Sequence, residues 1–301
     1  MRLFSKITTA VAVATTTAFS LFTSPEATVA FSITPNNNGS DLLNTLLGNA
    51  TGLSNFKITT TGDPAAFGLF SDDPFGLGSG IVLSTGRVEQ LPGENTEDID
   101  LDMEGNEPST DFGEPSEEDD LINLTIEFDA DATADKLSFQ YVFGSEEFLE
   151  FVDSMYNDSF ELLLNGVNLA KLSDGQPVTI KNLAPSSDCI PVSIENVAPA
   201  AGSCHSDYIN NPKGPGTKTR LDGFTKVLTF EGLLNRNSRN TLSINIQDVG
   251  DGIFDSAVFI KAQSLKAEPP PSQDIPEPSL LFGLLGLGVF GFGSQLLHKQ
   301  K

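Results

Sequence analysis

The chain has no tryptophan, only two histidines and only two cysteines among its 301 residues. Histidine is the side chain that most readily exchanges protons near neutral pH, so two histidines offer little for acid–base catalysis. The sequence also contains no Gly-x-Ser-x-Gly elbow, no His-Glu-x-x-His pair and no phosphate-binding glycine loop. These absences predict that the protein is not an enzyme.

Positive charge is also scarce. The chain holds 17 lysines and arginines against 41 aspartates and glutamates, which gives a formal net charge of −24. Residues 89–120 alone carry 14 acidic side chains and no basic one, a run more typical of a solvated loop than of a site. A surface of this sign repels nucleic acid and anionic lipid, so we expect no nucleic-acid partner.

The aromatic residues are mostly phenylalanine, with 22 Phe against three Tyr. Phenylalanine is large and apolar and needs no hydrogen-bond partner, so it suits a dry core. Apolar and polar residues alternate, as in residues 124–129, which is the pattern of strands with one buried face. Turn residues separate nine strand-like stretches, at 56–61, 80–84, 121–128, 137–143, 159–164, 177–180, 225–230, 241–247 and 256–262. We therefore predict an all-β fold, a sandwich or jelly-roll-like antiparallel domain.

One short helix is expected ahead of these strands. Four leucines between residues 42 and 47 fall on one helical face, Asp41 is placed to cap that helix and Gly48 to end it. The pattern predicts a short amphipathic N-terminal helix.

The N-terminus has the order of a secretory signal peptide. Arg2 and Lys6 precede a mostly apolar stretch at residues 7–22, and the small residues Thr28 and Ala30 fit a cleavage site. The stretch is rich in threonine and short of the roughly 20 strongly apolar residues that a membrane span needs. We therefore expect export, with cleavage after Ala30.

The composition changes again near the C-terminus. Residues 268–279 are rich in proline and predict a stiff, extended linker. The apolar stretch that follows, residues 280–297, would be about 27 Å long as a helix, close to the thickness of a bilayer's hydrocarbon core. Lys299 and Lys301 then predict a cytoplasmic end for this transmembrane helix. The predicted divisions are the signal peptide 1–30, the β domain 31–267, the linker 268–279 and the span with its basic tail 280–301.

The two cysteines lie in the exported region. Cys189 and Cys204 are 15 residues apart, and an oxidising compartment favours a disulfide between them. Closing a loop of this length stabilises a fold by about 3 kcal/mol in the chain-entropy model. A catalytic cysteine would need a basic partner, for which the sequence offers only His205 and His298. We predict the disulfide.

The tail resembles a known sorting signal. The motif Pro276-Glu277-Pro278, followed by an apolar span and a basic end, resembles the PEP-CTERM signal of bacterial envelope proteins. The resemblance covers residues 275–301 and implies an exosortase-type processing enzyme as a partner, and often an association with exopolysaccharide. It implies a protein anchored in the inner membrane through its span before processing, and later found at the cell surface or in the extracellular matrix.

The body of the chain resembles a second family, the choice-of-anchor L domain. The blocks that carry the resemblance are GIVLSTG at 80–86, YVFGSEEF at 141–148, YNDSF at 156–160, DGFTKVLT at 222–229, and NIQDVGD with FDSAVFI at 245–260. Phe148 and Phe151 stand where tyrosines are common in the family. The resemblance implies a surface-placed domain whose C-terminal anchor varies, and it implies no established activity.

The acidic residues of these blocks fall at the ends of expected strands. Carboxylates at such spacing, on a backbone that glycines allow to bend, are the hard oxygen ligands that Ca²⁺ prefers. Capping of turns by the individual side chains is the alternative. Calcium is the only cofactor that we expect, and its candidate ligands are Glu146, Glu147, Glu150, Asp158, Asp248, Asp251 and Asp255.

The sequence supports one leading function and two alternatives. The leading function is an exported, non-catalytic adhesion or extracellular-matrix module that associates with exopolysaccharide or a surface protein and is sorted by an exosortase. The first alternative is a calcium-dependent glycan-binding module. The second is a polysaccharide hydrolase that uses two carboxylates, with Glu147 and Asp251 as its acid and base.

Overall fold

The computed structural model describes residues 30–96, 108–112, 120–191, 202–249 and 252–271. The expected signal peptide, the sorting motif, the C-terminal span and Asp251 lie outside these residues. Within the described part of the chain, no helix is both long and apolar enough to cross a membrane. The predicted signal peptide and membrane anchor therefore stay predictions.

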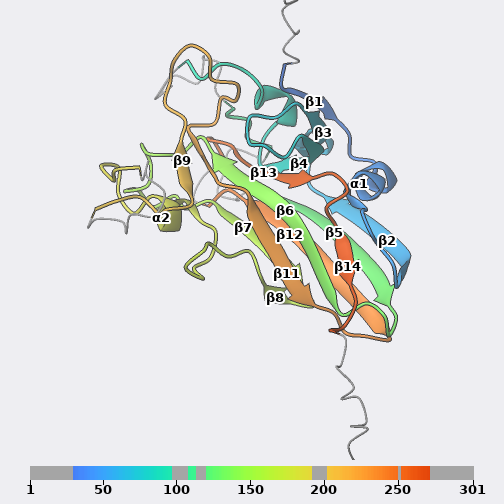
Figure 1. The fold of residues 1–301 in the computed structure, drawn as a ribbon. Helices are drawn as coiled ribbons and strands as arrows, with labels where there is room; N and C mark the ends of the chain where they lie inside the picture. Colours follow the sequence, from blue (N-terminus) through green and yellow to red (C-terminus); the bar gives the residue numbers. More distant parts are fainter. Residues whose placement is uncertain (1–29, 97–107, 113–119, 192–201, 250–251, 272–301) are drawn as a thin grey trace, which may run out of the picture.

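Two antiparallel sheets pack face to face (Figure 1). The smaller sheet has five strands in the order β2-β5-β12-β7-β8, with bounds Leu53–Thr61, Leu121–Ala130, Ser238–Gln247, Ser159–Leu164 and Val167–Asn168. The larger sheet has nine strands. Seven follow the order β1-β3-β4-β13-β6-β10-β9, with bounds Ser32–Pro35, Phe67–Ser71, Ser79–Ser84, Ser256–Lys261, Lys136–Ser145, Gly223–Thr225 and Tyr208–Asn210.

The long strand β6 organises the larger sheet. One of its edges pairs with β10 and then with β11, Leu228–Leu233. Its other edge pairs with β13 and then with β14, Lys266–Glu268. Because β14 ends at Glu268, the paired structure reaches the first residue of the proline-rich linker.

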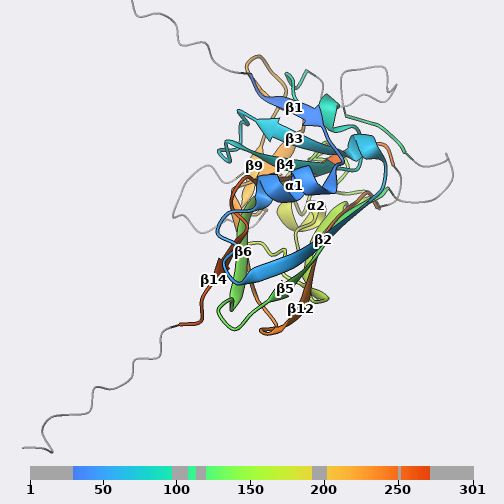
Figure 2. The same cartoon turned by 90° about the vertical axis from the view of Figure 1, so that its right-hand side faces the viewer.

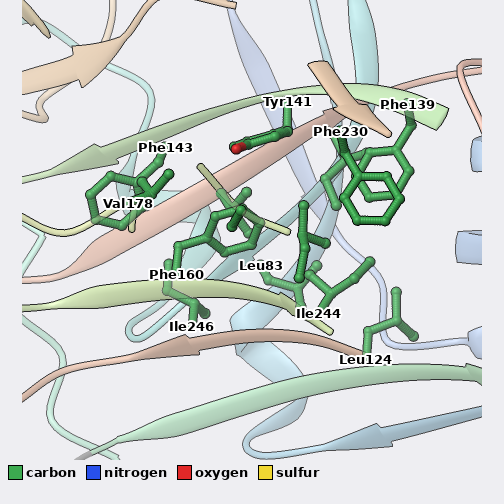
Figure 3. Packing of buried hydrophobic residues seen from close by; sticks show 14 of the residues in the cluster. Leu83, Leu124, Phe139, Tyr141, Phe143, Phe160, Val178, Phe230, Ile244 and Ile246 are labelled. Carbon is green, nitrogen blue, oxygen red and sulfur yellow. The ribbon is translucent and has the colours of Figure 1, made fainter. Parts of the chain in front are cut away.

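Alternation along the strands builds the core between the sheets. Residues of β5 and β12 alternate between buried and partly exposed, so each strand turns one apolar face inward. Aromatic rings of the larger sheet meet this face (Figure 3): the ring centroids of Tyr141 and Phe160 are 5.1 Å apart, and those of Phe139 and Phe230 are 4.7 Å apart. The phenylalanines thus serve the core, as their number predicted.

A second, smaller core covers the outer face of the larger sheet. Phe259 of β13 lies at its centre, with ring centroids 5.5 Å from Phe70 and 4.5 Å from Phe75. Val258 and Ile260, on the opposite face of the same strand, belong to the main core. Burial on both faces explains why residues 257–260 are continuously apolar rather than alternating.

Four short helical segments complete the described fold. They are α1, Gly39–Leu46, the one-turn helix α2, Ile180–Leu183, and the 3-10 turns at Pro64–Ala66 and Val88–Gln90. Figure 2 shows α1 lying across the edge of the sandwich, against β2 and β4. Its buried leucines are Leu42, Leu43 and Leu46.

The all-β fold and the short N-terminal helix are confirmed, with local corrections. The cap of α1 is Asn38, whose side chain accepts bonds from the Ser40 and Asp41 amides, and not Asp41. The expected strand at 225–230 is interrupted rather than continuous: β10 and β11 both pair antiparallel with β6, and a register shift of one residue at Lys226 and Val227 separates them. The expected strand at 177–180 is wrong, since Thr179 caps α2 and only isolated bridges form there. The strands β1, β3, β8, β9 and β14 are short and were not predicted.

Cys189 and Cys204 are joined by a disulfide in the structure. Both side chains are buried in the main core. The bond joins residues 15 positions apart, and residues 192–201 between them lie outside the described part of the chain.

Candidate functional site

The topology brings the ends of six strands together at one end of the sandwich. Strands β4, β6 and β12 end there, and β5, β7 and β13 begin there, at the end to which the arrowhead of β6 points (Figure 1). In the larger sheet Ser145 pairs with Ser256, and in the smaller sheet Gln247 pairs with both Leu121 and Ser159. Residues directly outside these positions therefore meet across the two sheets.

These residues are acidic. We call the four aspartates Asp120, Asp158, Asp248 and Asp255 the aspartate cluster. Three of the four precede a strand directly, and Asp248 follows one directly. The exposed fractions are 0% for Asp255, 1% for Asp158, 2% for Asp248 and 8% for Asp120. Glu146 and Glu147, which follow β6, are 2% exposed each. Carboxylates are seldom buried to this degree without a compensating partner.

Three members of the cluster accept hydrogen bonds from neighbouring segments of the chain. Asp158 accepts a bond of 2.6 Å from the Ser256 hydroxyl and one of 3.0 Å from the Val249 amide. The segment 108–112 folds over the same end: the Thr110 amide donates to Asp255 Oδ1 at 3.1 Å. The Phe112 amide donates to Asp120 Oδ2 at 2.9 Å.

Other oxygens of the cluster are buried without such bonds. Both carboxylate oxygens of Asp248 and Oδ2 of Asp255 have no hydrogen-bond partner among the described residues. The Thr85 hydroxyl lies near Asp248 but does not reach hydrogen-bond geometry with it, and the Asp158 carboxyl group is close enough to share a proton with Asp248 when one of the two is protonated. A buried polar oxygen without a partner costs about 1–3 kcal/mol, and more when it is charged. Among the described protein atoms, no donor therefore compensates the burial of these three oxygens.

The surroundings disfavour the ionised forms of these carboxyl groups. Burial raises the pKa of Asp248 well above its usual value, and the negative charges of Asp158 and Asp255 raise it further. Burial also raises the pKa of Asp255, which the bond from Thr110 partly offsets and the charges of Asp120 and Asp158 reinforce. Burial likewise raises the pKa of Asp120. The four groups repel one another, so the cluster needs protons or a cation to be stable.

No basic side chain supplies that compensation in the described part of the chain. Asp120, Asp248 and Asp255 form no ion pair with a described lysine, arginine or histidine. Described ion pairs involve other residues, such as Lys57 with Glu127 at 3.0 Å.

Gly86 gives the cluster room. A Cβ atom at this position would lie 1.8 Å from Asp255 Oδ2, so the carboxylate rests directly on the glycine backbone. Any larger residue at position 86 would have to displace the carboxylate. The GIVLSTG block thus ends in a residue that the site requires.

The structure places part of the expected calcium ligand set at one end of the sandwich. It brings Glu146, Glu147, Asp158, Asp248 and Asp255 to one end of the fold. Glu150 is only partly buried and lies near Tyr208, whose pKa its charge helps to raise after the larger effects of burial and Asp222. Asp251 lies outside the described residues. In the described residues as they stand, no three acidic, histidine or cysteine side chains are arranged so as to hold a metal ion.

Sequence reasoning missed Asp120, Thr85, Ser256 and Gly86. Asp120 was assigned to the solvated acidic run, and that assignment is wrong for this residue and for Pro108, which are both buried. A usable signal did exist: Asp120 precedes β5 directly, as Asp158 precedes β7 and Asp255 precedes β13.

A second feature is the outer face of the five-stranded sheet. Its centre holds uncharged polar side chains: Asn123 donates to the Ser243 hydroxyl at 2.7 Å and to the Asn245 side-chain oxygen, and Thr125 donates to Asn123 at 2.8 Å. Asn245 also donates to the carboxylate of Glu161 on β7 at 3.4 Å. We call Asn123, Thr125, Ser243 and Asn245 the amide–hydroxyl patch. All four side chains are partly exposed, so the patch is a preformed array of hydrogen-bonding groups facing solvent.

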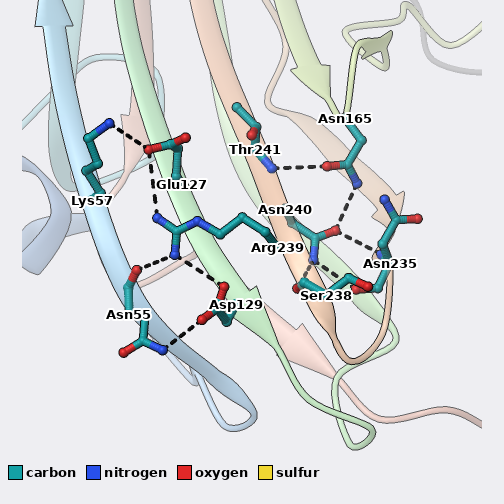
Figure 4. Close-up of polar contacts among 10 residues, drawn as sticks. All are labelled: Asn55, Lys57, Glu127, Asp129, Asn165, Asn235, Ser238, Arg239, Asn240 and Thr241. Carbon is teal, nitrogen blue, oxygen red and sulfur yellow. Dashed lines mark hydrogen bonds and ion pairs between the residues drawn. The ribbon is translucent and has the colours of Figure 1, made fainter.

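Towards the other end of the sandwich the same face is charged (Figure 4). Arg239 donates to Asp129 at 3.3 Å and to the backbone oxygen of Asn55 at 2.7 Å. A shallow surface hollow lies beside this network, lined by Ala132, Leu234, Asn235, Arg236, Asn237, Ser238 and Arg239. Its lining contains no carboxylate, and it lies at the opposite end of β12 from the aspartate cluster.

Comparison with known proteins identifies one family. A model of the choice-of-anchor L domain matches residues 32–266, which include both sheets, the aspartate cluster and the amide–hydroxyl patch. No curated protein and no solved structure matches the chain.

Proposed function

The chain belongs to the choice-of-anchor L domain family, and we propose that it is a non-catalytic module that binds matrix exopolysaccharide at the bacterial cell surface. Family membership points to an anchored surface protein. The observation that carries the finer proposal is the amide–hydroxyl patch. Its groups donate and accept hydrogen bonds, as sugar hydroxyls do, and they lie on adjacent strands about 4.8 Å apart.

The charge of the protein narrows the class of polysaccharide. With a net charge of −24, the chain repels anionic polymers, and the patch adds no positive charge: its four side chains are neutral and the Glu161 carboxylate lies beside them. A neutral polysaccharide therefore fits best. Each patch contact would be weak, and many copies of the protein along one polymer would multiply the binding.

Burial of the one described candidate carboxylate argues against hydrolysis. A glycosidase needs two carboxyl groups that flank an accessible sugar. Glu147, one of the two candidates, is 2% exposed, and the described hollow at the surface has no acidic lining. Burial inside the end of a fold suits a structural role rather than contact with a polymer.

In this proposal the C-terminal tail directs the protein to the cell surface. The Pro276-Glu277-Pro278 motif would be read by an exosortase-type enzyme after export, and the span at 280–297 would hold the chain in the inner membrane until then. The linker between β14 and the motif would reach about 25 Å if extended, which would separate the domain from the membrane surface.

Binding of neutral polysaccharide from the producing cells tests the proposal. The exported protein should bind it, and the double substitution Asn123→Ala with Asn245→Ala should weaken binding at least tenfold. Glu231→Gln, on an exposed position of the other sheet, is the matched control and should bind like wild type. Equal binding by the double variant would contradict the assigned face. Release of new sugar ends by the wild type would contradict the non-catalytic role.

A further inference from the structure

The aspartate cluster has a different location from the patch and calls for a separate explanation. It lies at the end of the sandwich, whereas the patch lies on the outer face of one sheet. We propose that the aspartate cluster binds one Ca²⁺ ion, with Asp158, Asp248 and Asp255 as charged ligands and Asp120 as the fourth acidic neighbour.

Three carboxylate oxygens of the cluster are buried without a hydrogen-bond partner among the described residues. Asp248 is 2% exposed, and neither of its carboxylate oxygens has a hydrogen-bond partner in the described protein. Oδ2 of Asp255, a side chain with 0% exposure, is in the same state. A fold that buried these oxygens for structural reasons alone would gain from an apolar or amide side chain there, because unpaired buried charge is strongly destabilising. A bound cation removes that cost.

The side chains around the cluster offer only oxygen ligands among the described residues. The described groups at this end are carboxylates and the hydroxyls of Thr85 and Ser256, which are all hard oxygen donors. Ca²⁺ accepts six to eight such oxygens at 2.3–2.6 Å in flexible geometry, while Mg²⁺ demands a near-ideal octahedron. Carboxylates that come from strand ends of two separate sheets suit the more tolerant ion.

Backbone hydrogen bonds already hold the residues of the cluster close to one another. The described side chains do not form a finished coordination shell, and mutual repulsion holds like charges apart. The backbone is already in position: the Asp248 amide donates to Asp120 O at 3.1 Å, and the Glu146 amide donates to Asp255 O at 3.1 Å. In the proposed calcium-bound state, the side chains of Asp248 and Asp255 rotate toward a common point within this backbone frame.

The ion would link the two sheets. Asp158 and Asp248 belong to the five-stranded sheet and Asp255 to the nine-stranded sheet. Binding to the folded state alone raises stability by mass action, and weak sites fill at the millimolar calcium found outside cells. Calcium would therefore make the domain most stable after export.

Thermal unfolding and calorimetric titration of the exported protein with Ca²⁺ alone test the site. Calcium at 2 mM should raise the Tm by about 5 °C or more over chelator, and Mg²⁺ should raise it much less. Asp248→Asn should abolish the shift and, because it removes a buried charge, should be at least as stable as wild type in chelator. Asp72→Asn, in the exposed turn between β3 and β4, is the matched control and should keep the full shift.

Two results would overturn the site. One is a wild-type protein, folded by circular dichroism, whose Tm does not change with calcium and which shows no binding heat. The other is Asp248→Asn that keeps the calcium shift. Neither result bears on polysaccharide binding, since the Asn123 and Asn245 variants leave the aspartate cluster unchanged.

Discussion

The hydroxyl of Ser256 donates a 2.6 Å hydrogen bond to Oδ2 of Asp158, and this bond joins the first residue of β13 to the residue before β7. The two strands belong to different sheets, so a single buried contact ties the sandwich together at its acidic end. Both side chains are at most 1% exposed, so the bond acts in surroundings of low dielectric.

Loss of this bond should destabilise the fold. Ser256→Ala leaves a buried carboxylate oxygen with one donor fewer, so we expect the free energy of unfolding to fall by about 1.5–3 kcal/mol. Ser84→Ala is the control, because the Ser84 hydroxyl contacts neutral groups alone in the described structure: it donates to the backbone oxygen of Ser256 at 3.0 Å and accepts from the Gly86 amide at 3.2 Å. Its cost should be about 1 kcal/mol. Equal costs in denaturant titrations would show that the charge of Asp158 adds nothing.

The pKa of Asp129 should respond first to Asn55 and second to Arg239. The Asn55 amide donates to Asp129 at 2.7 Å and lowers the pKa of Asp129 below its usual value, and Arg239 lowers it further. Asn55→Gly, which tolerates the positive φ of 52° at this position, should raise this pKa more than Arg239→Gln does.

The sign of the stability effect follows from the lowered pKa. Asp129 contributes stability above its unfolded pKa and loses it as the pH falls through its folded pKa. The effect should be small because the group is exposed to solvent and screened. NMR titration measures the pKa directly, and a larger shift from Arg239→Gln would reverse the order of causes.

The disulfide between Cys189 and Cys204 should be present in exported protein. Mass spectrometry after alkylation should find no free thiol, and replacing both cysteines with serine should cost about 3 kcal/mol of unfolding free energy. Two alkylated thiols in protein recovered from the cell surface would show that the two cysteines are not bonded to each other.

The sorting motif should control the fate of the tail. With Pro276-Glu277-Pro278 replaced by alanines, the full-length chain should accumulate in the inner membrane, whereas wild type should appear at the surface without residues 280–301. Deletion of the span alone should send the domain to the soluble exported fraction. A motif variant that is trimmed and distributed like wild type would make the tail a plain anchor.

Much of the fold was predictable because strands with one buried face alternate apolar and polar residues along the sequence. β5 and β12 alternate between a buried and a wet face, so their existence and type were predicted correctly. The failures lie where this period is absent. β1 and β9 are edge strands of four and three residues, too short to show alternation, and the register shift between β10 and β11 leaves no signal in a run that is strand-like throughout.

The acidic end was only partly predictable. Asp158, Asp248 and Asp255 stood out because they flank strong strand patterns. Asp120 did not, because it ends a long acidic run whose local composition indicates solvent. Its burial follows from the register that pairs Leu121 with Gln247, and strand register is a long-range property that composition does not encode.

A crystal structure of the exported protein grown in millimolar calcium, with anomalous diffraction, tests the calcium site most directly. The account predicts an anomalous peak about 2.4 Å from carboxylate oxygens of Asp158, Asp248 and Asp255. An ordered aspartate cluster with no such peak, its carboxylates bonded to one another through shared protons, would contradict it.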